Sequence, residues 1–345
     1  MAPSLRLVGA PGSPYTRKMR ALLRYRRIPF QFVVRGSKED QGIPDVPVAL
    51  IPVLVLPEEG GEADRAMIDS TFQIRELERR VSGRAVLPPD PVVAFVDALV
   101  EDYGDEWLTK AMFHYRWAYE PDIRKASQIL PRWAAVDADD ADIAKLSKLF
   151  AQRQIGRLGV VGSNPTTTPV IEESYRRFLR IFDTLLSRQP FVLGRRPGSA
   201  DFAIFGQLTQ LVNFDPTPAA IAAGHPRVVA WMDLMEDLSG LEPEDGDWMA
   251  RDAIAEVTGN LLAEIGRVYT PFLLGNAEAL SRGAAQVECE IDGRKWVQKP
   301  FPYQGKCLGW LRERYAGLSS DDRGTVDALL DGTGCEPLFD VASTG

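Results

Sequence analysis

The pattern of apolar positions near the start of the chain predicts a short strand that leads into an amphipathic helix, within residues 5–27. A Gly/Pro turn separates the two, and Ser13 and Pro14 stand at the N-cap and first helical positions that these residue types prefer. The apolar residues that follow recur at the spacing of one buried helix face; they are Tyr15, Met19, Leu22 and Leu23. The positive end of this helix therefore offers a hydroxyl and free N–H groups to a thiolate, a carboxylate or a phosphate.

Two further apolar segments extend this pattern. After a second strand near residues 29–34, Pro52 interrupts the aliphatic run at residues 47–57. Proline removes a ladder donor, so Pro52 is expected at a sheet edge, a bulge or a cis turn. Asp69 and Ser70 then open a helix, which again presents free N–H groups to an anion.

In order and spacing, these elements of the first 80 residues resemble the N-terminal thioredoxin-like half of the glutathione transferase superfamily. The resemblance is to a bacterial member of the Ser type with an extended C-terminal region. It implies that glutathione is a co-substrate and that Ser13 donates a hydrogen bond to its sulfur. It also implies that the backbone of Ile51, before a cis Pro52, pairs with the cysteinyl amide, while Asp69 and Ser70 hold the γ-glutamyl end.

The resemblance continues in the second half of the chain. Residues 191–211 look like the motif that begins the core helix of the all-helical domain in that family, where a Ser or Thr usually starts a capping pattern. Gly198 stands at that place, so either Gly198 or Ser199 must cap the helix. Asp201 still lies in the first turn, where a carboxylate stabilises the helix dipole.

The whole chain is predicted to have an α+β fold in three parts. With 345 residues, of which 45% are hydrophobic, it is long enough for two or three domains with a sizeable core. A thioredoxin-like α/β domain that binds glutathione (1–86) is followed by an all-helical domain (92–241). The C-terminal extension (242–345) completes the chain.

The C-terminal extension is predicted to contain helices and a β-hairpin. Asp292 and Gly293 are typical of a two-residue hairpin turn, which would place Cys289 opposite Trp296. The extension carries enough apolar surface to dock on the rest of the chain, whereas a free tail would be polar. Its role does not follow from its residues.

Composition argues against several function classes. A net charge of −8 and a pI of about 5.1 argue against a nucleic-acid partner. The start of the chain lacks a signal-peptide pattern, and no apolar run approaches the ~18 residues that a membrane span requires, so a cytoplasmic protein without a membrane partner is expected. No group of His, Cys and Asp residues has metal-ligand spacing, so no metal is expected.

The cysteines bear on the chemistry. All three lie near the C-terminus, without a Cys-x-x-Cys pair. Ser13 and Thr16 stand at the places of the two cysteines in a redox-active helix of that type. Disulfide reduction therefore lacks its attacking thiol, and the thiol of bound glutathione is expected to react instead. Ser13 would donate a hydrogen bond to the thiolate, with Thr16 and Tyr15 as alternative donors.

Aromatic residues are dense in a predicted long helix at residues 92–119. In the family the corresponding helix lines the second-substrate pocket and the dimer interface. The resemblance therefore implies a homodimer and a pocket for a small apolar electrophile near Tyr15, Tyr103, Trp107 and His114. Aromatic residues in a helix are more often simply core, and this is the alternative for these positions.

Two functions are compatible with the sequence. One is a glutathione transferase, acting in detoxification by conjugation, dehalogenation, ether cleavage or isomerisation of an electrophile. The alternative is a non-catalytic protein of the same fold that binds glutathione and a hydrophobic ligand. The presence of Ser13, Pro52 and the Asp69-Ser70 pair together favours catalysis, because a pure binder needs no donor aimed at the sulfur.

Overall fold

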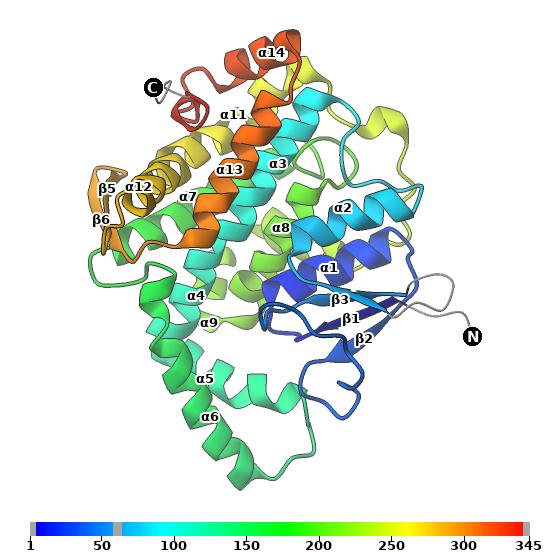
Figure 1. Cartoon of the computed structure of the whole chain (residues 1–345), viewed down its shortest axis with the longest axis vertical. Helices are drawn as coiled ribbons and strands as arrows, with labels where there is room; N and C mark the ends of the chain where they lie inside the picture. Colours follow the sequence, from blue (N-terminus) through cyan, green and yellow to red (C-terminus); the bar gives the residue numbers. More distant parts are fainter. Residues whose placement is uncertain (1–4, 58–63, 341–345) are drawn as a thin grey trace.

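The computed structural model describes residues 5–57 and 64–340, and it begins with a four-stranded sheet in the strand order β2-β1-β3-β4 (Figure 1). The strands are β1 (Leu5–Gly9), β2 (Phe30–Val34), β3 (Val53–Leu56) and β4 (Arg65–Met67). β1 and β2 are parallel and are joined through helix α1 (Pro14–Tyr25), whereas β3 is antiparallel to both β1 and β4. This mixed sheet confirms the predicted thioredoxin-like domain.

The strand register places three chain segments at one edge of the sheet. Val8, near the end of β1, pairs with Val53 at the start of β3, and Leu54 pairs with Met67 at the end of β4. The turn after β1, the loop before β3 and the start of helix α2 (Ser70–Arg80) therefore meet at that edge.

Alternation along the strands gives the sheet two apolar faces. Leu7 and Leu54 pack into the main core together with Leu22 of α1 and Ile74 of α2. Figure 1 shows α1 and α2 between the sheet and the helical domain. The opposite face carries a separate small core of valines; they are Val8, Val33, Val53 and Val55.

The second domain is all helical. Its α-helices are α3 (Pro91–Glu106), α4 (Leu108–Ala118), α5 (Glu120–Ile129), α6 (Asp140–Ile155), α7 (Thr168–Leu186), α8 (Ser199–Leu208), α9 (Pro216–Ala222) and α10 (Pro226–Met235). The predicted long helix at 92–119 is a pair of helices, α3 and α4, that meet at Trp107. Helix α8 packs against both α1 and α3, so it joins the two domains.

The N-terminus of α8 shows how the chain does without the usual Ser or Thr cap. Gly198 is the N-cap, and its N–H donates to the Asp201 carboxylate at 2.9 Å. Asp97 of α3 accepts hydrogen bonds from the Ala200 N–H, at 3.1 Å, and from the Ser199 hydroxyl. A Cβ on Gly198 would lie 2.4 Å from Oδ1 of Asp97. A carboxylate from another helix thus takes both the space and the capping role of the missing side chain.

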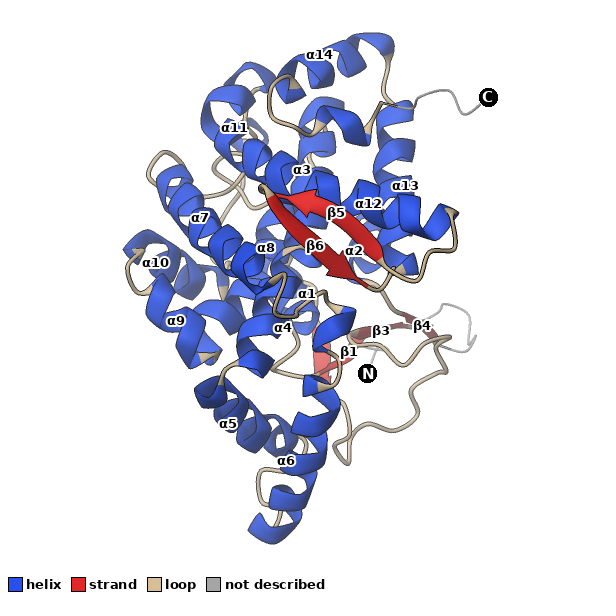
Figure 2. Ribbon diagram, turned by 90° about the vertical axis from the view of Figure 1, so that its left-hand side faces the viewer, coloured by secondary structure: helices blue, strands red, loops and turns tan. Residues whose placement is uncertain are grey.

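The C-terminal extension contains helices and the predicted hairpin (Figure 2). Its elements are α11 (Ile254–Glu264), a π-helical turn (Ile265–Tyr269), α12 (Thr270–Ser281), β5 (Val287–Ile291), β6 (Arg294–Gln298), α13 (Pro302–Ala316) and α14 (Ser320–Leu330). Asp292 and Gly293 have φ values of 54° and 70°, as a type I′ turn requires. The predicted pairing of Cys289 with Trp296 is confirmed.

The extension packs on the helical domain. Helix α13 runs beside α3, and α14 also contacts α3 (Figure 1). Helix α12 packs against both β5 and α13. No helix in the described ranges is long and apolar enough to cross a membrane.

Candidate functional site

Ser13 lies at the sheet edge where the three segments meet, as the N-cap of α1. Its backbone is extended, with φ −93° and ψ 121°, and its Oγ accepts a hydrogen bond from the Thr16 N–H at 3.3 Å. The side chain is half-buried. Capping uses only the oxygen as an acceptor, so the hydroxyl proton remains available to an acceptor in front of the helix.

The turn that presents Ser13 is held by two arginines and one aromatic ring. Arg17 Nε donates to the Pro11 carbonyl at 2.9 Å, and Arg116 Nη1 donates to the Gly12 carbonyl at 3.0 Å. Arg116 is itself fixed by a buried ion pair with Asp215, at 2.9 Å. A Cβ on Gly12 would lie 2.2 Å from the Trp133 ring, so that ring rests directly on the turn.

The hydroxyl groups of Tyr15 and Thr16, the two alternative donors to sulfur, are less available than that of Ser13. The Tyr15 hydroxyl donates to the Asp105 carbonyl at 2.9 Å. Burial, with the Glu106 and Asp105 carboxylates, raises the pKa of Tyr15 well above its ordinary value. Thr16 is fully buried, and its Oγ1 accepts a hydrogen bond from the Ala10 N–H at 3.3 Å. Of the three hydroxyl groups, that of Ser13 best suits a donor to an incoming ligand.

The second segment is the loop before β3. The Ile51–Pro52 peptide bond is cis. The buried Gln73 of α2 donates through Nε2 to the Pro52 carbonyl, at 2.9 Å, and to the Met67 carbonyl, at 2.8 Å. Within the described residues, the N–H and C=O of Ile51 have no hydrogen-bond partner. This leaves one free backbone donor and one free acceptor for an extended ligand, in the manner of a strand.

The third segment is the start of α2. Asp69 is its N-cap and has a φ of 73°, a left-handed conformation that is costly for a residue with a side chain. Oδ1 of Asp69 accepts from the Thr71 N–H at 3.1 Å, and Oδ2 accepts from the Tyr303 hydroxyl at 2.6 Å. The adjacent Ser70 is the first residue of the helix and is buried. A carboxylate and a helix N-terminus thus lie side by side and suit a zwitterionic group.

A buried ion-pair network links the domains behind the site. Lys18 of α1 pairs with Glu101, at 2.7 Å, and with Asp105, at 2.6 Å. The hydroxyls of Thr71 and Ser199 each lie 3.0 Å from a Glu101 oxygen. Burial raises the pKa of Glu101, but the Lys18 ammonium and these hydrogen bonds outweigh it, so the pKa is lowered. Helices α1, α2, α3 and α8 are thereby fixed relative to one another.

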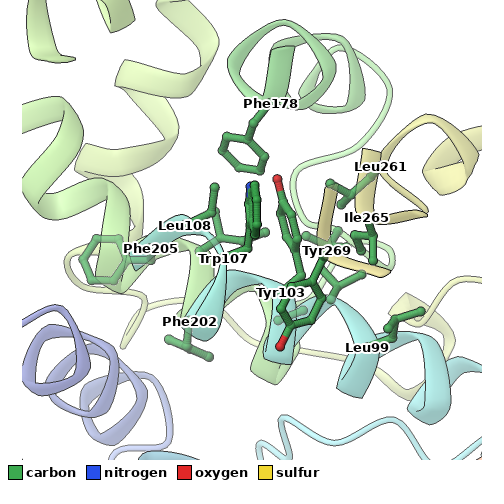
Figure 3. Close-up of a cluster of buried hydrophobic side chains, with 14 of the residues drawn as sticks. Leu99, Tyr103, Trp107, Leu108, Phe178, Phe202, Phe205, Leu261, Ile265 and Tyr269 are labelled. Atoms are coloured by element: carbon green, nitrogen blue, oxygen red, sulfur yellow. The ribbon is translucent and has the colours of Figure 1, made fainter. Parts of the chain in front are cut away.

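Three of the four aromatic residues proposed for a second-substrate pocket are buried. Tyr103 and Trp107 are buried and pack against Tyr269 of the extension (Figure 3). His114 is buried, with Nδ1 2.8 Å from the Ser163 hydroxyl. Only Tyr15 of the proposed set is partly exposed. The aromatic ring that does contact the turn before Ser13 is Trp133, which follows α5 in a 3₁₀ turn.

Four residues of the site were not predicted from the sequence; they are Gln73, Arg116, Trp133 and Tyr303. Each acts through a contact with a residue far away in the sequence, and none belongs to a local motif. A glutamine with apolar neighbours at Phe72 and Ile74 was the one available hint, because a buried amide needs a partner.

Comparisons with known proteins point to one family. Residues 7–85 match the model of the glutathione S-transferase N-terminal domain, and residues 135–234 match that of the C-terminal domain. Comparison with curated proteins gave no match. Among solved structures, a glutathione S-transferase from Methylobacterium radiotolerans in complex with glutathione sulfonate is 20% identical, with a TM-score of 0.42 over 74% of this chain and 94% of its own. A glutathione S-transferase from Rhodospirillum rubrum is also 20% identical, with a TM-score of 0.42 over 72% of this chain and 98% of its own.

Proposed function

Since the chain belongs to the glutathione transferase superfamily, we propose that it activates the thiol of glutathione for attack on an electrophilic small molecule. The two matched halves together cover slightly more than half of the chain. The proposed reaction transfers an alkyl or aryl group to sulfur, and dehalogenation, ether cleavage and isomerisation use the same activated thiolate.

Glutathione would bind along the sheet edge. Its cysteinyl residue would pair with the free N–H and C=O of Ile51, as an added strand does. Its γ-glutamyl carboxylate would face Ser70 and the N-terminus of α2, and its ammonium group would face Asp69. The sulfur would then lie at the N-terminus of α1, in front of Ser13.

Ser13 is proposed to stabilise the thiolate. A free thiol has a pKa of about 8.5, and lowering it by 2 units requires roughly 2.7 kcal/mol of preferential stabilisation of the thiolate. One hydroxyl donor, backed by the helix N-terminus, can supply a stabilisation of this size. The single observation that carries the proposal is the half-buried Ser13 hydroxyl, whose oxygen caps α1 while its proton stays free for a ligand.

The electrophile is proposed to bind against Trp133. Its ring covers Gly12, the residue before Ser13, and is only partly buried. Leu130 lies next to it over the same glycine. An apolar wall beside the sulfur would hold an apolar substrate in reach of the thiolate, which reduces the entropic barrier. Trp133 replaces the buried Tyr103, Trp107 and His114 in this role.

The proposal is tested by titrating the ultraviolet absorbance of the thiolate of bound glutathione. The wild type is expected to show a thiol pKa about 2 units below the free value. Ser13→Ala is expected to bring that pKa back toward 8.5 and to lower kcat at neutral pH about tenfold, with little change in the KM for glutathione. Thr16→Val tests the alternative donor: it should leave the thiol pKa near the wild-type value, although it also removes the acceptor of the Ala10 N–H.

An unchanged thiol pKa in Ser13→Ala would remove Ser13 from this role. Tight glutathione binding without turnover of any electrophile would favour the non-catalytic alternative. The homodimer and the cytoplasmic location stay predictions, which light scattering and cell fractionation check.

A further inference from the structure

Asp69 has a partner from the far end of the chain. Its Oδ2 accepts a hydrogen bond from Tyr303, 234 residues later, at 2.6 Å, while Oδ1 accepts from the Thr71 N–H. No Lys, Arg or His in the described part of the chain forms an ion pair with Asp69. The carboxylate therefore has hydrogen-bond donors but no opposite charge at ion-pair distance.

The Tyr303 hydroxyl is suited to accept a further hydrogen bond. Its single proton is directed at Asp69. Burial, with the Asp69 and Glu106 carboxylates, raises the pKa of Tyr303, so the phenol stays protonated. Its oxygen retains lone pairs for an N–H donor. Asp69 and Tyr303 together present a negative charge and a neutral acceptor next to each other.

Contacts with α12, α3 and α2 hold helix α13 in place and so fix the position of Tyr303. Asn276 of α12 clamps the residue before the helix, because its side chain accepts from the Phe301 N–H at 2.8 Å and donates to the Phe301 carbonyl at 3.1 Å. Gln304 donates to Glu106 of α3 at 3.0 Å. Trp310 packs edge-on against Phe72 of α2, with ring centroids 5.0 Å apart. The phenol is thus held against both α2 and α3.

A small cavity of about 30 Å³ lies between α2, α3 and α13, with Tyr303 in its wall. This volume is large enough for one water molecule or one ammonium group. Four carboxyl groups of α3 line it; they are Glu101, Asp102, Asp105 and Glu106. Oδ1 of Asp105 is buried and has no hydrogen-bond partner among the described residues. The guanidinium groups of Arg75 and Arg314 line the same cavity, and Lys18 pairs with Glu101 and Asp105, so charges of both signs surround Tyr303.

We propose that α13 completes the site for the γ-glutamyl end of glutathione, and that Tyr303 gives this site its selectivity for a ligand with an α-ammonium group. The inference rests on the proposed function, in which Asp69 and Ser70 hold that end. The ammonium group would pair with the Asp69 carboxylate and donate a second hydrogen bond to the Tyr303 oxygen.

The experiment uses two ligands and two variants of the full-length chain. S-methylglutathione has no ionisable thiol, and its desamino analogue, with glutaryl in place of γ-glutamyl, lacks only the ammonium group. Calorimetric titration is expected to show that Tyr303→Phe binds S-methylglutathione about tenfold more weakly than the wild type and binds the desamino analogue equally well. Tyr315→Phe is the matched control, because Tyr315 is also on α13, donates to a carboxylate, Asp327 of α14, at 2.6 Å, and lies outside the site. It should bind both ligands as the wild type does.

Each other outcome overturns a defined part of the proposal. If Tyr303→Phe binds S-methylglutathione unchanged or more tightly, or weakens on both ligands alike, the inference about Tyr303 fails and the proposed function stands. A wild type that prefers S-methylglutathione over the desamino analogue less than twofold also overturns it, whether or not the variant folds. A wild type that binds no S-methylglutathione overturns the proposed function itself.

Discussion

Replacing Asp97 with asparagine is expected to stabilise the fold at neutral pH and to leave it unchanged at acidic pH. The Asp97 side chain is 1% exposed and accepts hydrogen bonds from Ser199 and from the Ala200 N–H. Burial raises the pKa of its carboxyl from 3.8 to about 7, the hydrogen bond from Ser199 opposes the rise, and the Glu101 carboxylate adds to it. Between about pH 4 and pH 7 the native state therefore holds a proton that the unfolded chain has lost.

The sign and size of the effect follow from this difference. A raised native pKa gives stabilisation that is complete below about pH 4 and is lost as the pH rises to about 7. A shift of roughly 3 units corresponds to about 4 kcal/mol, as an upper bound. Asparagine is neutral at every pH. Its N–H can donate to the Ser199 oxygen, while the Ser199 hydroxyl donates to Glu101, 3.0 Å away.

Urea unfolding at a series of pH values between about 4 and 8 checks this prediction. Asp97→Asn should be as stable as the wild type near pH 4 and more stable by up to about 4 kcal/mol at pH 8. Asp142→Asn, at an exposed carboxyl of α6, is the control and should show no such trend. A difference that stays constant with pH, or a variant less stable than the wild type at pH 8, would refute the reasoning by showing that the fold does not raise the pKa of Asp97.

Three further predictions concern packing and the site. Gly198→Ser, which restores the residue type usual at this cap, should lower stability by roughly 1–3 kcal/mol because its Cβ meets Asp97 at 2.4 Å; thermal unfolding checks this, and an unchanged Tm would contradict it. Trp133→Ala should raise the KM for an apolar electrophile and leave glutathione affinity within about twofold. Steady-state kinetics with both substrates varied measures the two effects, and a change only in the KM for glutathione would contradict the prediction. Deletion of residues 242–345 should abolish cooperative unfolding, because Tyr269 and Trp296 belong to the main core; a truncated chain that unfolds in one sharp transition would contradict this.

The parts of the structure that the sequence predicted depend on local signals. The Ser13 cap and the Asp292-Gly293 turn were predictable because each is a conformational preference of the residue itself, satisfied within a few neighbours. The cap of α8 was only half predictable. The sequence shows a glycine at Gly198, but the carboxylate that replaces the missing hydroxyl comes from Asp97, on a helix about a hundred residues earlier.

The aromatic residues of α3 and α4 could not be assigned from periodicity. A helical spacing of aromatic rings shows that one face is covered, and it does not show whether a ligand or another helix covers it. Here the covering rings come from the extension. Trp107 packs against Tyr269, Phe272 and Trp296, with centroid separations of 6.5, 5.9 and 5.4 Å. Tyr103 and Trp107 are therefore buried core residues, which was the alternative to a place in a ligand pocket.

The same packing connects the extension to the site. Because the rings of α12 and β6 are part of the main core, the extension is held rigidly along α3 and cannot lie there in several positions. A fixed α12 places Asn276, which sets the start of α13 and hence the position of Tyr303. Tyr303 then reaches Asp69, whose backbone is already held in a costly left-handed conformation. The geometry at the start of α2 therefore depends on core contacts made by the last hundred residues of the chain, and core substitutions in the extension should alter ligand affinity as well as stability.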